Sequence, residues 1–403
     1  MPQCQNSKET MKRNKQNETW PVFSKEEINK VSKILTSGKV NYWTGEECKK
    51  FEKEFSNWTK SKFSIAVSNG TVALDLALTA LDLGAEDEVI VSPRSFIASV
   101  SSVVSIGANP VFADIDISTG NLSAETISKK ITKRTKAIIC VHLGGLPCEM
   151  TKIMSLAKQH NLFVIEDCAQ AHGAIYKGRS VGTIGDIGAW SFCQDKIITT
   201  GGEGGMITTN NKHLWKKMWS YKDHGKDFDE VNLPNNSSIY KWVHKSFGTN
   251  FRMTEMQGAI GRKQLKKIGN WNKLRNRNAF IIKESLQKFP ELVSLYDTPK
   301  YINHAYYRVY ASINPEYLRE KWSRDRIINE ISNRGVPCFI GSCPEIYRED
   351  AFKNSNIGLS KPLPNAKLLG ETSIAFLCHP TLTKQSLNNS NKIISEVLKS
   401  AQK

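Results

Sequence analysis

Three stretches of the sequence carry residues that could do chemistry together. Lys196 follows an apolar run in "WSFCQDKIITTGGEGGMITTN", residues 190–210. A charged lysine at the end of a buried strand is costly unless it is paired or reacts, and a buried amine with a lowered pKa is a nucleophile toward carbonyls. Asp167 ends the run "LFVIED". A carboxylate there is either a helix cap or the counter-ion of a cation, and on its own the position favours the cap.

The third stretch is "VSNGT", residues 67–71, which ends a predicted strand and opens a predicted helix. The backbone N–H groups of Gly70 and Thr71 would point at an anion, assisted by the helix dipole. The alternative is an ordinary turn between strand and helix. Neither this stretch nor "GGEGG" has the spacing of a dinucleotide-binding motif. An anion site, a buried carboxylate and a reactive lysine are together what pyridoxal phosphate requires, so we predict that cofactor.

The elements that must position these residues alternate along the chain. Short apolar runs at 63–70, 87–93, 110–116, 137–145 and 162–170 predict strands, and helical patterns lie between most of them. Continuous apolar strands alternating with helices indicate a mainly parallel sheet that is buried on both faces. Ligands bind beyond the carboxyl ends of such strands, so the three stretches are expected to meet there.

The chain is long enough for two domains. We predict a disordered tail over residues 1–22, an N-terminal segment with a large cofactor-binding domain over 23–270, and a small α+β domain over 271–403. Ser24 and Glu27 fit a capping box at the start of the first of two helices that flank "SGKVNYWTGEE". The N-terminus has no apolar segment typical of a signal peptide, and no apolar run approaches the ~18 residues that span a bilayer.

Composition limits the alternatives. The nine cysteines are scattered without a CxxC pair, which disfavours a disulfide framework or a zinc site and favours the cytoplasm. Cys140 and His142 would share a strand face, but two ligands do not make a metal site, so we predict no metal. The net charge of +17 could indicate a nucleic-acid-binding protein. Because the basic run 261–278 surrounds a helix, we interpret it as a solvated helix face.

Matching stretches spread over nearly the whole chain resemble one known family. The sequence resembles the DegT/DnrJ/EryC1/StrS family of sugar aminotransferases, which have the aspartate-aminotransferase fold (fold type I, α/β). The resemblance lies in "NYWTGEECKKFEKEF", "SNGTVALDLAL", "VIEDCAQAHGA", "GDIGAWSFCQDKIITTGGEGGMITTN", "YKDHG", "FGTNFRMTEMQGAIGRKQL" and "SIAFLCHPTLT".

The resemblance implies a role for each residue around the cofactor ring. Lys196 matches the lysine that joins the cofactor aldehyde and then moves the proton at the substrate carbon. Asp167 matches the aspartate that keeps the pyridinium nitrogen protonated. Gln170 matches a residue near the phenolic oxygen, and Phe96 matches an aromatic ring that packs on the cofactor face.

The resemblance also implies how the phosphate is bound and how subunits assemble. Gly70, Thr71 and Ser191 fall where the family binds the phosphate. Asn250 matches an asparagine that reaches the phosphate from the neighbouring subunit, which implies a homodimer with shared active sites. Trp43 and His224 are expected to line the sugar pocket, with a packing or loop role as the alternative for each. Cys193 and Gln194 depart from many relatives, and Cys193 is either reactive or simply packed.

The predicted function is a pyridoxal-phosphate-dependent transfer of an amino group, with pyridoxamine phosphate as intermediate, from glutamate to a nucleotide-linked keto-sugar. Family members that dehydrate sugars carry histidine in place of the lysine, so Lys196 argues for transamination. The alternatives are sugar dehydration, a basic nucleic-acid-binding protein and a non-catalytic regulatory relative. The sequence does not specify the sugar, the nucleotide or the ring carbon that receives nitrogen.

Overall fold

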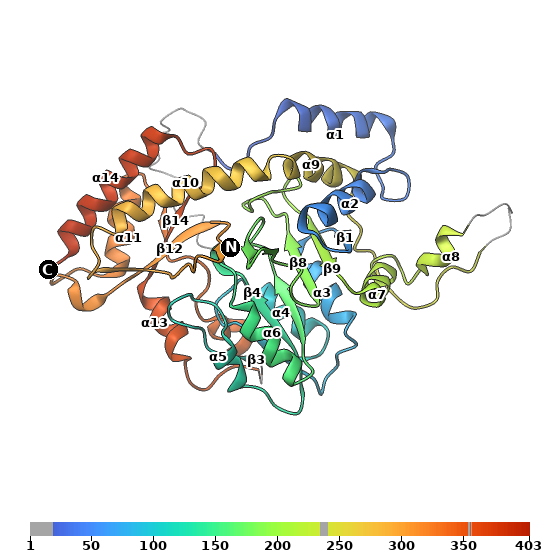
Figure 1. Cartoon of the computed structure of the whole chain (residues 1–403), viewed down its shortest axis with the longest axis horizontal. Helices are drawn as coiled ribbons and strands as arrows, with labels where there is room; N and C mark the ends of the chain where they lie inside the picture. Colours follow the sequence, from blue (N-terminus) through green and yellow to red (C-terminus); the bar gives the residue numbers. More distant parts are fainter. Residues whose placement is uncertain (1–18, 234–240, 354, 356) are drawn as a thin grey trace.

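The computed structural model describes residues 19–233, 241–353, 355 and 357–403 (Figure 1). Residues 1–18 of the predicted disordered tail lie outside the described residues. Trp20, which the prediction also placed in the tail, packs edge-on against Trp271 with ring centroids 5.0 Å apart. Its Nε1 donates a hydrogen bond of 2.8 Å to the Lys196 carbonyl. The prediction is therefore wrong at Trp20, because its ring buries against other aromatic side chains.

The largest sheet has seven strands in the order β1-β9-β8-β5-β4-β2-β3. Only β9 runs antiparallel to its neighbours in this sheet, which confirms the predicted mainly parallel sheet. All residues of β2, β8 and β9 are buried, as expected for a sheet with both faces covered. The strands are β1 Phe63–Val67, β2 Glu88–Val91, β3 Asn109–Phe112, β4 Thr135–Val141, β5 Phe163–Asp167, β8 Ile187–Ser191 and β9 Gly205–Thr209.

Helices follow the strands in the predicted alternation. The Asn69 side chain caps the helix after β1 by accepting from the Val72 N–H, which satisfies one of the free donors at the helix start. The helices of this region are α3 Gly70–Thr79, α4 Ala98–Ser105, α5 Ala124–Ser128, α6 Met150–Gln159, α7 Lys212–Lys222 and α8 Phe228–Asn232. In Figure 1, α8 lies at the end of a segment that projects away from the main sheet.

Two N-terminal helices, α1 Lys25–Ser37 and α2 Glu47–Thr59, pack against α9 Glu255–Leu265. The predicted capping box at Ser24 and Glu27 is confirmed.

Ion pairs join these two N-terminal helices to the basic run 261–278. Arg262 pairs with Glu47 and Glu54, both at 2.6 Å. Lys263 pairs with Glu26 at 3.0 Å, and Lys267 with Glu27 at 2.7 Å. The solvated-face interpretation is wrong for these residues, because they form ion pairs with acidic side chains of α1 and α2. These partners lie more than 200 residues away in the sequence, so the local pattern could not show them.

The C-terminal part has its own apolar core. A four-stranded sheet in the order β10-β12-β14-β13 is covered by α10, α11 and α14. Its strands are β10 Val293–Leu295, β12 Arg308–Ile313, β13 Cys338–Phe339 and β14 Ser373–Leu377. Its helices are α10 Ile268–Leu286, α11 Arg324–Asn333, α12 Asp350–Lys353, α13 Pro364–Thr372 and α14 Lys384–Ala401. Figure 1 shows α10 running from α9 into this C-terminal part.

A small third sheet, β11-β6-β7, connects the two parts through β6 Ile175–Tyr176, β7 Arg179–Ser180 and β11 Ile302–Asn303. Three short 3-10 turns, η1 Leu143–Gly145, η2 Pro315–Tyr317 and η3 Ile346–Arg348, complete the described elements. Among the described residues, no helix is long and apolar enough to cross a membrane.

Candidate active site

Asp167 is the last residue of β5 and is almost completely buried. Its Oδ2 accepts a hydrogen bond of 2.8 Å from Ser99 Oγ, and its Oδ1 accepts one of 3.1 Å from the Ala169 N–H. Burial raises the pKa of Asp167, although these two hydrogen bonds and the nearby charge of Lys196 oppose the shift. The helix-cap alternative is wrong, because the described residues 168–174 form turns and no helix.

The start of α3 lies beside the end of β8. Gly70 is the first residue of α3, and a Cβ atom added to it would lie 2.6 Å from Ser191 Cβ. Ser191 lies two residues beyond Ala189, which pairs with Asp167 in the sheet register. Thr71 is exposed in the first turn of α3. The helix start, Ser191 and Asp167 therefore lie at one edge of the sheet, as predicted from the strand order.

Lys196 lies five residues beyond β8, so the prediction that it ends a strand was wrong. Its side chain is 17 % exposed. Its Nζ lies 3.2 Å from Asp195 Oδ1 and 5.2 Å from the centroid of the Tyr307 ring. The hydrogen bond from Trp20 to the Lys196 carbonyl fixes the backbone at this point.

The charge state of Lys196 differs from the expectation. Burial by itself lowers the pKa of Lys196, but the charges of Tyr307 and Asp195 outweigh burial and raise it. The predicted lowered pKa is therefore wrong for the amine as it stands in this structure. The sequence reasoning did not consider the carboxylate at the preceding residue, which holds the amine in its charged form.

Gln170 and Phe96 lie near Asp167 but differ in their exposure to solvent. Gln170 is buried, and its Oε1 accepts a hydrogen bond of 2.7 Å from the Gly144 N–H in η1. Phe96 is 58 % exposed and follows Ser95, whose Oγ lies 2.8 Å from that of Ser99. An exposed flat apolar ring next to the Ser99–Asp167 pair could stack on a planar ligand.

Asn250 lies in a segment that runs beside the end of β1. The Ser68 N–H donates to the Phe251 carbonyl at 3.0 Å, and Asn250 forms a β-bridge with Asp223. The Asn250 side chain is exposed and accepts a hydrogen bond of 3.3 Å from the Arg252 N–H. Within one chain it contacts neither Lys196 nor Asp167 in any hydrogen bond or ion pair of the described residues.

The two residues predicted for the sugar pocket lie in segments that touch. Lys226 Nζ lies 4.3 Å from the centroid of the Trp43 ring, which joins "NYWTGEE" to the segment containing His224. His224 is exposed, with a φ of 60°. Trp43 lines a cavity of about 470 Å³ between α2, α7 and α8, whose lining does not include Lys196, Asp167 or Gly70. The structure does not bring Trp43 into hydrogen-bond or ring contact with Lys196.

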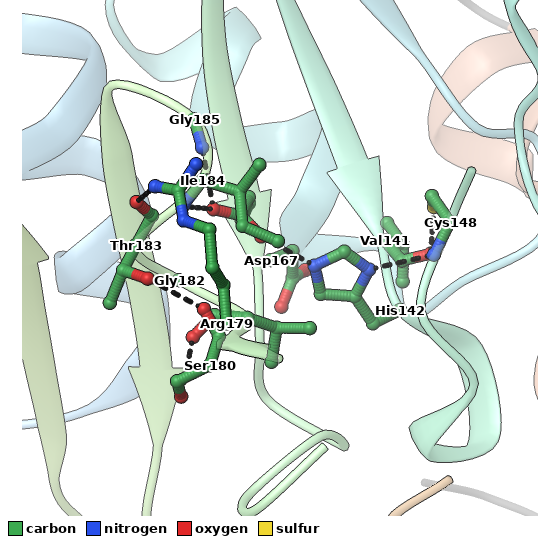
Figure 2. Close-up of polar contacts among 12 residues, drawn as sticks. Val141, His142, Cys148, Asp167, Arg179, Ser180, Gly182, Thr183, Ile184 and Gly185 are labelled. Atoms are coloured by element: carbon green, nitrogen blue, oxygen red, sulfur yellow. Dashed lines mark hydrogen bonds and ion pairs between the residues drawn. The ribbon is translucent and has the colours of Figure 1, made fainter. Parts of the chain in front are cut away.

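A buried polar network lies under the Asp167 end of the sheet (Figure 2). His142 Nε2 lies 3.0 Å from Glu166 Oε2, and His142 Nδ1 accepts a hydrogen bond of 3.1 Å from the Cys148 N–H. Glu166 Oε1 accepts hydrogen bonds of 2.7 Å from each of the Ile184 and Gly185 N–H groups. Burial opposes ionisation of Glu166, but the hydrogen bond and charge of His142, followed by the Gly185 N–H, outweigh burial and lower the pKa of Glu166.

The same network contains a group of residues that the sequence analysis did not find. Within the described residues, the ligand atoms of His142, Glu166 and Cys168 lie within 4.8 Å of one another. The sequence pairing considered was Cys140 with His142, which missed Glu166 on the neighbouring strand β5 and Cys168 directly after that strand. Because both ring nitrogens and both Glu166 oxygens already have hydrogen-bond partners, this group is better explained as a structural network than as a metal site.

The described cysteines are all free. Cys193 is half-buried, and its Sγ lies 3.9 Å from Glu203 Oε1. Burial, followed by the charge of Glu203, raises the pKa of the Cys193 thiol. A protonated thiol is a poor nucleophile, so these surroundings disfavour the reactive alternative for Cys193.

Three residues near Lys196 were not predicted as site residues. They are Asp195 and Tyr307, whose carboxylate and ring contact the lysine amine, and Arg308, whose guanidinium lies 3.7 Å from Asp195 Oδ2. Ser99, the hydrogen-bond partner of Asp167, was missed as well. Asp195 could have been noticed as a charge directly before Lys196. No sequence signal connects Asp195 or Lys196 to the strand β12, more than 100 positions later.

These residues fit pyridoxal phosphate by the chemistry of their groups. The start of α3 supplies free N–H groups for a phosphate, and Gly70 leaves room that a side chain would fill against Ser191. Asp167 is a buried carboxylate suited to a protonated ring nitrogen, and Lys196 is a partly buried amine suited to an aldehyde.

The chain is similar to known enzymes that are named for nucleotide-linked amino sugars. The chain is 41 % identical over 365 residues to GDP-perosamine synthase of Escherichia coli O157:H7, covering 90 % of this chain and 92 % of that protein. It is 38 % identical over 285 residues to the dTDP-3-amino-3,6-dideoxy-alpha-D-galactopyranose transaminase of Aneurinibacillus thermoaerophilus, covering 70 % and 75 %.

A solved structure supports the fold. The X-ray structure of the aminotransferase from Psychrobacter cryohalolentis superimposes with a TM-score of 0.93 and 54 % sequence identity, covering 95 % of this chain and 99 % of that chain. The predicted fold type I architecture is confirmed by this likeness. The model of the DegT/DnrJ/EryC1/StrS aminotransferase family matches residues 21–395, and the chain belongs to that family.

Proposed function

We propose that this aminotransferase uses pyridoxal phosphate to move an amino group from glutamate to a nucleotide-linked keto-sugar, yielding an amino sugar. The observation that carries the proposal is the arrangement at one sheet edge of buried Asp167, the start of α3 beside Ser191, and Lys196. When bound, the cofactor supplies an aldehyde that condenses with amines and a ring that accepts electrons from the carbon attached to nitrogen.

Lys196 and Asp167 divide the chemistry between them. Lys196 Nζ would hold the cofactor through its aldehyde, and as a free amine it would move a proton to and from the substrate carbon. Asp167, oriented by Ser99 and the Ala169 N–H, keeps a proton on the ring nitrogen. Burial raises the pKa of Asp167, and a protonated ring nitrogen would supply the opposite charge that keeps this carboxylate ionised.

The remaining predicted residues position the cofactor. The N–H groups at Gly70 and Thr71 and the Ser191 hydroxyl would hold the phosphate, and the α3 dipole would add to their attraction. Gln170, held next to η1, would lie near the phenolic oxygen, and the exposed Phe96 ring would pack on the cofactor face. The Gln170 side chain and the start of α3 are already fixed by the fold, so cofactor binding would require little reordering of these two groups.

The substrate class follows from the relatives. Those compared above are named for GDP- and dTDP-linked amino sugars. A net charge of +17 favours the approach of an anionic nucleotide sugar. Glutamate is the proposed donor, pyridoxamine phosphate the carrier between half-reactions, and the cytoplasm the proposed location.

We propose that two copies of the chain form a homodimer in which Asn250 reaches the phosphate of the partner's cofactor. The segment around Asn250 exposes large apolar side chains, with Trp242 81 % exposed and Phe247 99 % exposed. Side chains of this kind gathered on one segment are typical of a surface that another chain covers. Asn250 itself is exposed and so available to a partner.

The test incubates the full chain with pyridoxal phosphate, glutamate and a panel of GDP-, dTDP- and UDP-linked keto-sugars. We expect 2-oxoglutarate and, for at least one sugar, an amino-sugar product detected by mass spectrometry. The Lys196→Ala variant is the control and should release neither. Loss of water from the sugar without 2-oxoglutarate would identify a dehydratase instead, and the absence of both reactions would refute the proposal.

A further inference from the structure

The backbone of Lys196 lies in an irregular turn between β8 and β9. Residues 193–196 are exposed or half-buried, whereas Ile197 and Ile198 are completely buried. The Lys196 N–H donates to the Cys193 carbonyl at 3.1 Å within the same turn. The turn supplies no donor to the Lys196 carbonyl, so the position from which the amine extends depends on a group outside the turn.

Trp20 supplies that donor from the N-terminal end of the described chain. Its Nε1 lies 2.8 Å from the Lys196 carbonyl oxygen, a short hydrogen bond for an N–H donor. Among the described residues, Trp20 is the one residue beyond the turn that hydrogen-bonds to the Lys196 backbone. The two residues are 176 positions apart, so this contact exists only because the N-terminal segment folds back onto the turn.

The indole ring of Trp20 is held in its orientation from several sides. Trp271 packs edge-on against it, with ring centroids 5.0 Å apart. The Arg275 guanidinium lies 5.1 Å from the indole ring, and the His379 ring stacks on it at 6.4 Å. Aromatic and cation–π contacts of this kind depend on geometry, so together they fix the direction in which the indole N–H points.

Arg275 connects Trp20 to a second neighbour of the lysine. It is buried, and its Nη1 donates to the Tyr306 and Tyr307 carbonyls at 3.3 and 3.5 Å. The Tyr307 ring in turn lies 5.2 Å from Lys196 Nζ. The same arginine therefore packs on the ring that holds the Lys196 backbone and holds the backbone of the residue that faces the Lys196 amine.

We propose that Trp20 is a positioning residue for Lys196: its indole N–H holds the Lys196 backbone so that the amine stays beside Asp195 and the Tyr307 ring. The inference rests on the proposed function, in which Lys196 is the amine that reacts. A misplacement of about 1 Å at a reacting group can cost about 10²-fold in rate, so a hydrogen bond that fixes the backbone of this group contributes to catalysis without touching a substrate. The alternative is that Trp20 only packs the N-terminal segment against the fold.

The test measures the reactivity of the Lys196 amine in the purified full-length protein after removal of any bound cofactor. Trace labelling with acetic anhydride and peptide mapping give the rate of Lys196 acetylation relative to the other lysines. Because the charges of Tyr307 and Asp195 raise the pKa of Lys196, the held amine is charged and reacts slowly. Trp20→Phe keeps an aromatic ring and removes the donor. It should raise the rate about two- to tenfold, the effect of one lost neutral hydrogen bond.

Two further proteins separate the hydrogen bond from packing. Trp322→Phe is the matched control, because Trp322 is also half-buried and also has an arginine on its ring, Arg326 at 4.4 Å. It should be labelled at the wild-type rate. Incorporation of 3-benzothienylalanine in place of Trp20 keeps the shape of the ring and puts sulfur where the N–H is. This protein should be labelled as fast as Trp20→Phe, and it decides the question if Trp20→Phe does not fold.

Wild-type labelling of the benzothienylalanine protein would reduce Trp20 to a packing role and overturn the proposal, as would equally fast labelling of Trp322→Phe. In turnover, Trp20→Phe should lower kcat for 2-oxoglutarate release and leave the KM for glutamate nearly unchanged.

The labelling needs neither cofactor nor substrate, so its outcome is independent of the proposed reaction. An inactive protein whose Lys196 labelling depends on Trp20 would refute amino transfer and retain the positioning of the amine. An active protein whose labelling does not depend on Trp20 would do the opposite.

Discussion

Asp167 shows how a single side chain limits the chemistry of a site. Desolvation makes its charged form unfavourable, and the hydrogen bonds from Ser99 and Ala169 offset only part of that cost, since its pKa remains raised. A protonated pyridine nitrogen would supply the missing opposite charge. The carboxylate is therefore poorly matched to a purely structural role, in contrast to Glu166, whose two oxygens are both fully hydrogen-bonded.

Asp167→Asn should reduce the rate of 2-oxoglutarate release from glutamate by on the order of 10² or more, comparable with the loss of a key electrostatic group. The amide has nearly the same shape and still accepts from Ser99, so the thermal unfolding midpoint should change little. Asp186→Asn is the matched control, because Asp186 accepts the Val164 N–H at the other end of β5. Near-normal turnover in a folded Asp167→Asn variant would remove Asp167 from the mechanism.

At the scale of the elements, the site depends on how closely α3 and β8 approach. Gly70→Ala would place a Cβ 2.6 Å from Ser191 Cβ, so the helix or the strand must shift. Overpacking of this kind costs roughly 1–3 kcal/mol. We expect lower thermal stability and weaker pyridoxal phosphate affinity, measured by titration of cofactor absorbance. Gly84→Ala, where an added Cβ meets nothing within 4 Å, should bind the cofactor like the wild type.

The network around Glu166 joins β4, β5 and the turn before β8. Glu166→Gln should destabilise the protein by roughly 1.5–3 kcal/mol at pH 7, as for a lost hydrogen bond to a charged group. Since folding lowers the pKa of Glu166 below its ordinary 4.5, its contribution is present above that pH and is lost as the pH falls through the folded-state pKa. The stability difference between variant and wild type, measured by urea unfolding, should therefore shrink in acid. A constant difference from pH 7 into acid would contradict this account.

Local patterns explain which elements could be predicted. The strands β1, β2 and β5 and the cap at Ser24 follow from runs of a few residues, and the sheet edge that brings Asp167 and Gly70 together follows from their order. The pairing of Arg262 with Glu47 could not be predicted, because it joins residues 215 positions apart. The same holds for the contact of Lys196 with Tyr307, whose charge together with that of Asp195 outweighs burial and reverses the expected pKa shift of Lys196.

At the scale of the whole molecule, the proposed dimer can be tested by complementation. Lys196→Ala and Asn250→Asp should each be inactive alone, the second because a carboxylate repels the cofactor phosphate. In a hybrid dimer one site carries both defects and the other carries neither, as two-fold symmetry requires. Activity should therefore return to about half that of a wild-type dimer for each hybrid.

The complementation requires proof that subunits exchange, for example by native mass spectrometry of differently tagged chains. A mixture of two copies of the same variant is the control and should stay inactive. If hybrids form and no activity returns, Asn250 does not complete the partner's site.

The most direct measurement of the central claim is borohydride reduction of the protein loaded with pyridoxal phosphate, followed by peptide mapping. Reduction fixes the cofactor to whichever amine holds it. The account predicts a single pyridoxyl adduct on Lys196, whose Nζ lies beside Asp195 and the Tyr307 ring, and no adduct in Lys196→Ala. An adduct on another lysine, such as the fully buried Lys222, or no specific adduct at all, would contradict the account.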